Sequence, residues 1–231
     1  MRKAIFMFGW LIGVACSSVA SAQNGPVVVE LFTSQGCSSC PPADELLHDL
    51  AGRDGVIALA LHVDYWDYIG WTDSFGDPMH TARQQRYGAA AGHRSIYTPQ
   101  FIIGGQVHVV GANAMDVVDA IRAQRDQPSG MALQIARSGD RLVIAATATL
   151  AQPVIVHVAR YTPQESVSIN RGENAGREIS YANIVTDWRT VGEWDGRAPL
   201  DMQTTVRGNA PVVVILQERG PGRILAAAEL R

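Results

Sequence analysis

The sequence has a single lysine and only three cysteines among its 231 residues. It also lacks an excess of positive charge, because its formal net charge is −3. Loss of Arg2 and Lys3 with a cleaved N-terminus would lower this charge by two, to about −5. A chain of this charge does not favour the phosphate backbone of nucleic acids. We therefore expect no nucleic-acid partner.

Long apolar runs are absent beyond the N-terminus. The run Ala4–Ala15 is shorter than the roughly 20 residues that span a bilayer, and no later segment is long and apolar enough. Two cations precede this run and Ala20-Ser21-Ala22 follows it, which predicts a cleavable signal peptide over residues 1–22. A competing interpretation makes Cys16 a lipoprotein acylation site. In both cases we expect an exported protein, periplasmic or secreted, without a membrane span.

Two cysteines remain in the mature chain, and they lie close together. Cys37 and Cys40 form a Cys-Ser-Ser-Cys pair directly after the apolar run Val27–Phe32 and before a helix-like stretch. A disulfide that closes so small a ring stabilises a fold by only roughly 2 kcal/mol, against about 3 for a 15-residue loop. In an exported protein the pair therefore indicates reversible redox chemistry or metal capture more than a structural cross-link.

The first half of the chain, residues 26–127, alternates between strand and helix patterns, which predicts an α/β domain. The expected elements are a strand at Val27–Thr33, a helix at Asp44–Leu50, a strand at Val56–Val63, a helix at Pro78–Ala91, a hairpin of Phe101–Ile103 and Gln106–Val110, and a helix at Ala114–Arg125.

The second half, residues 130–231, consists of short strand patterns separated by turn signals. The expected strands are Met131–Ala136, Leu142–Leu150, Val154–Tyr161, Ile184–Val191, Val212–Gln217 and Ile224–Leu230. This pattern predicts a small all-β domain packed like a sandwich.

Three features of the first half coincide in a way that resembles a thioredoxin-like domain. These are the Cys37–Cys40 pair at a strand-to-helix junction, the alternating element order, and Thr98-Pro99 directly before a hairpin with Gly104-Gly105. The resemblance implies a central mixed sheet flanked by helices. It also implies that the peptide bond before Pro99 is cis and lies against the redox pair.

A closer resemblance extends over nearly the whole mature chain. It is to a family of exported bacterial proteins known only as a domain of unknown function. The matching segments are Glu30–Cys37, Pro41–Asp44, His62–Tyr68, Arg83-Gln84 and Tyr97–Gln100. This likeness implies fold and location, and chemistry only through the thioredoxin analogy.

The thioredoxin analogy assigns roles to several residues. Cys37 is the expected attacking thiol, and Cys40 the more buried thiol that resolves the mixed disulfide. Thr98 and Pro99 are expected to leave a backbone edge free for an extended substrate. Glu30 is expected to accept a proton from the second thiol, or alternatively to pair with a nearby arginine.

The prolines after the pair are a departure from the thioredoxin pattern. Pro41 and Pro42 directly follow Cys40, so the helix is expected to start at Pro42, with acidic residues in its first turn. We therefore expect Cys37 to feel less of the helix dipole than the corresponding thiol of a thioredoxin.

Other candidate residues carry two interpretations each. The aromatic cluster of Tyr65, Trp66, Tyr68 and Trp71 forms either a substrate platform beside the redox pair or a local core. His62 and Asp64 could join Cys37 and Cys40 as copper or zinc ligands, or His62 could be a buried, hydrogen-bonded histidine. The simplest interpretation of Arg83, Gln84 and Arg86 is a solvated helix face.

These observations favour an exported thiol-disulfide oxidoreductase that acts on protein or small-molecule thiols. Its only redox group is its own disulfide, so no separate cofactor is expected, and an unidentified redox partner recycles it. Two alternatives stay open. The first is a non-catalytic thioredoxin-like binding module, and the second is a copper- or zinc-binding metallochaperone.

Overall fold

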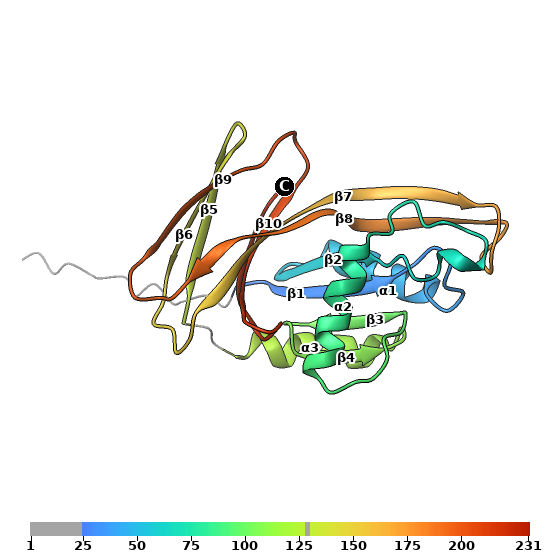
Figure 1. Cartoon of the computed structure of the whole chain (residues 1–231), viewed down its shortest axis with the longest axis horizontal. Coiled ribbons are helices and arrows are strands. Elements are labelled where there is room, and N and C mark those ends of the chain that lie inside the picture. Colours follow the sequence, from blue (N-terminus) through green and yellow to red (C-terminus); the bar gives the residue numbers. More distant parts are fainter. Residues whose placement is uncertain (1–24, 128–129) are drawn as a thin grey trace, which may run out of the picture.

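The alternation of strands and helices in the first half continues into an all-strand second half (Figure 1). The computed structural model describes residues 25–127 and 130–231. In chain order the elements are β1 (Val27–Thr33), α1 (Pro41–Ala51), β2 (Val56–His62), the 3-10 turn η1 (Asp67–Ile69), α2 (Pro78–Ala90), β3 (Gln100–Ile103), β4 (Val107–Val110), α3 (Ala114–Arg125), β5 (Ala132–Ser138), β6 (Arg141–Thr147), β7 (Val154–Ile169), β8 (Arg177–Trp194), β9 (Leu200–Thr205), β10 (Val212–Glu218) and β11 (Ile224–Leu230).

One sheet of eight strands runs through both halves of the chain, in the order β11-β10-β7-β8-β2-β1-β3-β4. β1 is parallel to β2 and antiparallel to β3. β8 joins the two halves, since Ile184 pairs in parallel with Ala60 of β2. Residues 130–231 therefore extend the sheet of the first half as well as forming a second sheet.

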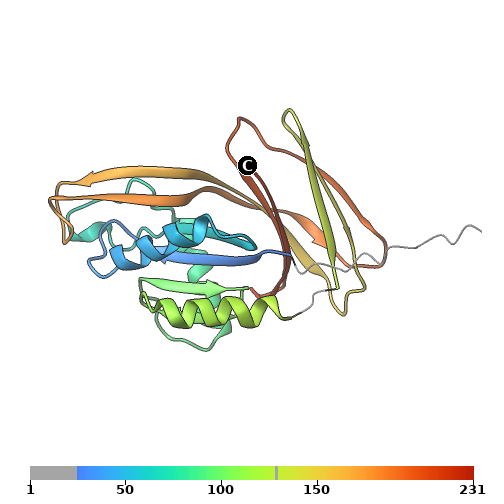
Figure 2. The same cartoon turned by 180° about the vertical axis from the view of Figure 1, so that it is seen from behind.

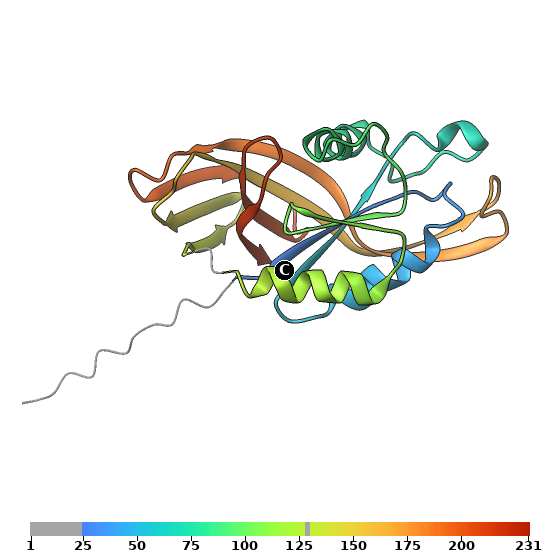
Figure 3. The same ribbon diagram turned by 90° about the horizontal axis from the view of Figure 1, so that it is seen from below.

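Both faces of β1 are buried, which is why residues 27–32 of this strand are an apolar run interrupted only by Glu30. Val27, Val29 and Leu31 pack with residues of α1 and α3, while Val28 and Phe32 pack with Tyr87 of α2. Figure 3 shows α2 and α3 on opposite sides of the sheet. The alternation along β1 thus assigns each side chain to one of two separate cores.

The elements of the first half agree closely with those expected from the sequence. β1 and α3 have the expected bounds, and β2, α2, β3 and β4 differ by one residue at an end. α1 begins at Pro41, earlier than the expected Asp44 and one residue before Pro42. Proline suits the first helical positions because their amide hydrogens have no intrahelical acceptor.

The long hairpin of β7 and β8 departs most from the sequence-based expectation. The sequence predicts Val154–Tyr161 and Ile184–Val191, whereas the strands extend to Ile169 and begin at Arg177. The added part of β7 is largely polar and exposed, so it lacks the apolar alternation that marks a buried strand. Asn183 has a φ of 47° and donates a side-chain hydrogen bond to the Ala58 carbonyl, beside the single bridge to β2.

A second sheet, in the order β5-β6-β9, packs against one end of the large sheet. Leu142 and Ile144 of β6 share a buried cluster with Val156 of β7 and Val214 of β10. Figure 2 shows these three strands at the end of the molecule away from the turn between β7 and β8. β9 was not predicted, because its sequence Leu-Asp-Met-Gln-Thr-Thr contains few apolar residues.

The predicted signal peptide, including Cys16, lies outside the described residues. Within residues 25–127 and 130–231, no helix has the length and apolar character needed to cross a membrane.

Candidate functional site

Cys37 and Cys40 form a disulfide in the loop between β1 and α1, with 5.4 Å between their Cα atoms. Cys40 is the N-cap residue of α1. Cys37 is 1% exposed and Cys40 is fully buried, whereas Ser38 and Ser39 between them are exposed. Cys40 is therefore the more buried of the two cysteines, as expected, but their exposed fractions differ very little.

The N-terminus of α1 offers few hydrogen-bond donors to the sulfurs. Pro41 and Pro42 have no amide hydrogen, and the amides of Ala43 and Asp44 both donate to the Cys40 carbonyl. The hydrogen-bond partner of Cys37 Sγ is instead the Ser39 hydroxyl, at 3.4 Å. The helix thus supplies little of the amide stabilisation that lowers the pKa of many reactive cysteines.

The turn between β7 and β8 covers the disulfide loop. Asn174 is 2% exposed, and its side-chain amide donates to the carbonyl oxygens of Gln35 at 2.9 Å and Cys37 at 3.0 Å. Its neighbours Glu173 and Ala175 are exposed. A Cβ on Gly172 would lie 3.2 Å from Trp71 Cβ, so this turn also packs on the aromatic loop. We call residues 170–176 the hairpin tip.

Asn174 could not be identified from the sequence, because its position on the disulfide loop depends on a contact 137 residues away in the chain.

The aromatic residues predicted as a platform are half-buried around the same loop. Trp71 Nε1 donates to Gln35 Oε1 at 2.8 Å, and Trp66 Nε1 donates to Thr98 Oγ1 at 2.7 Å. Trp66 also lies against Gly36, where an added Cβ would be only 3.2 Å from Trp66 Cβ. Glycine at position 36 therefore permits this close approach.

Tyr65 lies farther along the same aromatic loop. Its hydroxyl donates to Gln84 Oε1 at 3.1 Å, and the Gln84 amide in turn donates to the Tyr97 carbonyl and to Gln100 Oε1. The structure thus connects Tyr65 to the segment around Pro99.

The Thr98-Pro99 peptide bond is cis, as the resemblance to thioredoxin-like domains implied. Gln100, the next residue, pairs with Phe32 near the end of β1. Trp66 contacts both Thr98 and Gly36, and so connects this segment to the disulfide loop.

A cluster of buried titratable residues lies on the α1 face of the sheet, where β1 and β2 end. The Thr33 hydroxyl donates to Asp44 Oδ1 at 2.8 Å, and His62 Nδ1 pairs with Asp73 Oδ2 at 2.8 Å. Thr33 and His62 are register partners on neighbouring strands. Asp44 Oδ2 and His62 Nε2 are buried and have no hydrogen-bond partner among the described residues. We call Asp44, His62 and Asp73 the α1-face cluster.

The two acids of this cluster differ in their pKa values. Burial raises the pKa of Asp44 to about 7, although the charge of His62 and the hydrogen bond from Thr33 oppose this rise. Burial also acts to raise the pKa of Asp73. Its pKa nevertheless lies below the ordinary value, because the contact with His62 and the amides of Gln35 and Phe75 favour the carboxylate. One acid is thus set to exchange a proton near neutral pH, while the other stays ionised.

The sequence indicated His62 as a possible metal ligand beside the cysteines and Asp44 as an acid in the first turn of the helix, but it indicated neither the burial of Asp44 nor a role for Asp73. Asp44 has the appearance of an ordinary first-turn acid, and Asp73 lies in a loop without a motif. Within the described ranges, no group of three or more His, Cys, Asp or Glu side chains is arranged to hold a metal ion.

Glu30 belongs to a second buried cluster, on the α2 face of the sheet. Arg83 Nε donates to Glu30 Oε1 at 2.6 Å, and the Tyr87 hydroxyl donates to Glu30 Oε2 at 2.6 Å. Arg83 also donates to Tyr87 and to Gln217 of β10. The alternative of an ion pair for Glu30 is thereby confirmed. We call Glu30, Arg83, Tyr87 and Gln217 the α2-face cluster.

The prediction that Arg83, Gln84 and Arg86 form a solvated helix face is wrong for two of them. Arg83 is 2% exposed and Gln84 is fully buried, while Arg86 is exposed. The reason is that α2 buries a polar stripe against polar partners such as Glu30 and Gln100, so a polar pattern on the helix did not indicate solvent.

Comparison with known proteins places this architecture in a family without an assigned function. The chain resembles the crystal structure of an Agrobacterium tumefaciens protein, with 36% sequence identity and a TM-score of 0.78. The match covers 90% of this chain and 96% of that one. None of the curated proteins compared matches the chain. Residues 28–217 match the model of a family described as protein of unknown function DUF1223, and the chain belongs to that family.

Proposed function

We propose that this protein is an exported thiol-disulfide oxidoreductase whose first half, residues 26–127, is thioredoxin-like. The observation that carries the proposal is the position of the Cys37–Cys40 disulfide. It lies between the end of β1 and the first turn of α1, and the first turn of the same helix holds the buried, partly unpaired Asp44. A structural cross-link needs no titratable group of this kind beside it.

The reaction we propose is exchange between this disulfide and substrate thiols. A substrate thiolate attacks Cys37 Sγ, the Cys37–Cys40 bond breaks, and Cys40 leaves as a thiolate. A second substrate thiolate then attacks the substrate sulfur of this mixed disulfide and releases Cys37. The substrate loses two electrons and gains a disulfide, and the protein becomes a dithiol. In the reverse direction Cys37 attacks a substrate disulfide and Cys40 resolves the intermediate.

In this proposal Asp44 handles the proton of Cys40. Its protonated form supplies a proton to the leaving Cys40 thiolate, and its carboxylate accepts that proton when Cys40 becomes a nucleophile. A pKa of about 7 suits both steps near neutral pH. Glu30, which sequence analysis considered for this role, already accepts three hydrogen bonds from Arg83 and Tyr87 on the other face of the sheet.

The burial of Cys37 adds a condition to the proposed reaction. With 1% exposure, Cys37 is not open to in-line attack by a thiolate. Asn174 holds the hairpin tip on the Gln35 and Cys37 carbonyls, so we propose that the tip moves away before exchange. Thr98, Pro99 and the aromatic residues Trp66 and Tyr68 would then line the approach of an extended substrate.

Trapping of the mixed disulfide tests the proposal. A Cys40→Ser variant should accumulate Cys37-linked adducts with a peptide that carries a single thiol, after oxidation of Cys37 with an aromatic disulfide reagent. The peptide thiolate displaces the aromatic thiolate from Cys37, and neither the protein nor the peptide has a second thiol that resolves the adduct. Intact-mass spectrometry counts the adducts. A Cys37→Ser variant treated in the same way is the matched control, and it should form few adducts at the buried Cys40. Equal and slow reaction of both variants would contradict the assigned roles.

A further inference from the structure

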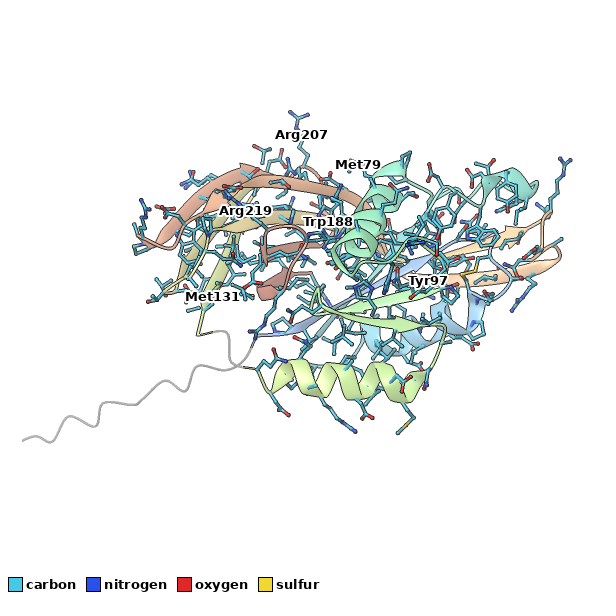
Figure 4. All side chains as sticks on the ribbon, turned by 60° about the horizontal axis from the view of Figure 1, so that its bottom comes forward. Met79, Tyr97, Met131, Trp188, Arg207 and Arg219 are labelled. Carbon is cyan, nitrogen blue, oxygen red and sulfur yellow. A yellow bond between two sulfur atoms is a disulfide. The ribbon has the colours of Figure 1, made fainter. Side chains whose placement is uncertain are left out.

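A cavity of about 360 Å³ lies between α2 and the strands β7 and β8, on the α2 face of the sheet. Met79 and Ala82 of α2 and Trp188 of β8 form its apolar wall. Figure 4 shows Met79 on α2 beside Trp188 on the neighbouring strand. None of its lining residues belongs to the disulfide loop or to the hairpin tip. Its size is within the range of small-molecule sites, roughly 300–1,000 Å³.

The charged groups around the cavity are mainly cationic. Arg83, Arg86 and Arg189 line it, and no carboxylate does. Glu30 neutralises Arg83, and Asp187 lies 3.5 Å from Arg189. Arg86 is exposed and has no hydrogen-bond or ion-pair partner in the part of the chain that the structure describes. One guanidinium group is therefore available to an anion.

His157 lies in the same positively charged environment. It lines the cavity, and its Nδ1 lies 3.2 Å from the Thr190 hydroxyl. Burial first, and then the charges of Arg83 and Arg86, lower the pKa of His157 to about 3. The imidazole is therefore neutral at physiological pH and adds no charge that would need compensation.

Trp188 gives the cavity a flat wall with an unused donor. The ring is 8% exposed, and the Arg83 guanidinium stacks over it at 3.9 Å from the ring centroid. The indole Nε1 is buried without an acceptor among residues 25–127 and 130–231. A buried donor without an acceptor is destabilising, so it is uncommon in a wall that has only a packing role.

We propose that this cavity binds a small organic carboxylate. The apolar body of the ligand lies against Met79, Ala82 and Trp188, and its carboxylate pairs with the Arg86 guanidinium, whose planar donors match two carboxylate oxygens. The inference is independent of the cysteines and holds whether or not the proposed redox function does.

Binding of benzoate to the oxidised protein tests the proposal by isothermal titration calorimetry. Benzamide has the same shape without the charge, and inorganic phosphate has charge without the apolar body. We expect benzoate to bind at least about tenfold more tightly than either probe, a difference of about 1.4 kcal/mol or more.

Two variants separate a local contact from the overall charge. Arg86→Gln should weaken benzoate binding about tenfold, because the paired guanidinium is lost. Arg94→Gln removes the same charge from an exposed residue outside the cavity and should change binding less than about twofold. Absence of benzoate binding at 10 mM (about 2.7 kcal/mol of affinity) would overturn the proposal. So would equal binding of benzamide or phosphate, or equal effects of the two variants.

Discussion

Two buried polar clusters lie on opposite faces of the same sheet, and they differ in how completely their hydrogen bonds are satisfied. In the α2-face cluster, Glu30 is bonded through both of its oxygens, to Arg83 and Tyr87. In the α1-face cluster, Asp44 Oδ2 and His62 Nε2 have no partner among the described residues. Both clusters are more than nine-tenths buried, so burial alone does not explain the difference.

The comparison suggests which cluster has a chemical role. A buried ion pair with every oxygen bonded fixes the position of α2 on the sheet and leaves no oxygen of Glu30 unpaired. A buried acid with a free oxygen and a pKa of about 7 changes protonation at little cost near neutral pH. We therefore interpret the Glu30 cluster as structural and the Asp44 cluster, next to Cys40, as functional.

The largest expected effect comes from breaking the α2-face cluster. Arg83→Met leaves Glu30 buried without its cation and should lower the free energy of unfolding by about 3–5 kcal/mol. Urea unfolding of the oxidised protein measures this. Arg86→Met, one turn later on α2 at an exposed site, is the matched control and should change it by less than about 0.5 kcal/mol. Similar losses in both variants would remove the distinction drawn for Arg83.

The next largest expected effect is a pH dependence of the free energy of unfolding that is caused by Asp44. The native state keeps the Asp44 proton up to about pH 7, while the unfolded chain releases it near its ordinary value of 3.8. The native state binds more protons between these values, so the free energy of unfolding falls as pH rises from about 4 to 7. In the wild type the free energy of unfolding should fall by a few kcal/mol over this range, and in Asp44→Asn this fall should be absent. The variant should therefore be more stable than the wild type at pH 8.

Unfolding in urea at several pH values checks this prediction. Asp49→Asn, at an exposed acid on the same helix, is the control and should retain the wild-type slope. An Asp44→Asn protein with an unchanged slope would mean that Asp44 is ionised in the native state.

A smaller effect is expected at the hairpin tip. Asn174→Ala removes two hydrogen bonds to the disulfide loop, each contributing about 1 kcal/mol, so the tip should open more often. We expect reduction of the disulfide by a phosphine to accelerate about tenfold, as followed by alkylation and mass spectrometry. Glu173→Ala, at an exposed neighbour in the same turn, should leave the rate unchanged. An unchanged reduction rate in Asn174→Ala as well would mean that the hairpin tip does not control access to the disulfide.

The smallest expected effect is at Ser39. Its hydroxyl is the one side-chain group at hydrogen-bond distance from Cys37 Sγ in the described part of the chain. In the reduced protein Ser39→Ala should lower the rate of Cys37 alkylation by iodoacetamide about two- to threefold, because one donor to the thiolate is lost. Ser38→Ala is the control, with a rate expected to match the wild type. An equal fall in both variants would point to loop flexibility instead.

Local patterns were sufficient to predict most of the first half. The continuous apolar runs of β1 and β2, the apolar face of α1 and the turn before β4 each depend on neighbours in sequence, and so do the bounds of α3. The cis Thr98-Pro99 bond came from the resemblance rather than from any pattern of residues.

The parts that the sequence did not predict depend on distant contacts. Arg83 meets Glu30 across 53 residues, and Asn174 meets Cys37 across 137. A polar residue on a helix or in a turn has the same sequence signature whether solvent or a buried partner faces it. For this reason the sequence identified the cysteine pair, but it predicted neither the burial of Asp44 nor the turn that covers the disulfide loop.

The redox equilibrium of the Cys37–Cys40 couple tests the central claim most directly. The native protein is equilibrated in glutathione buffers, and the oxidised fraction is measured by alkylation and mass spectrometry. Our account predicts a midpoint above about −300 mV, in the range where exchange with cellular thiols is reversible. A disulfide that stays oxidised below this potential in the folded protein would be a structural cross-link and would contradict the proposed function.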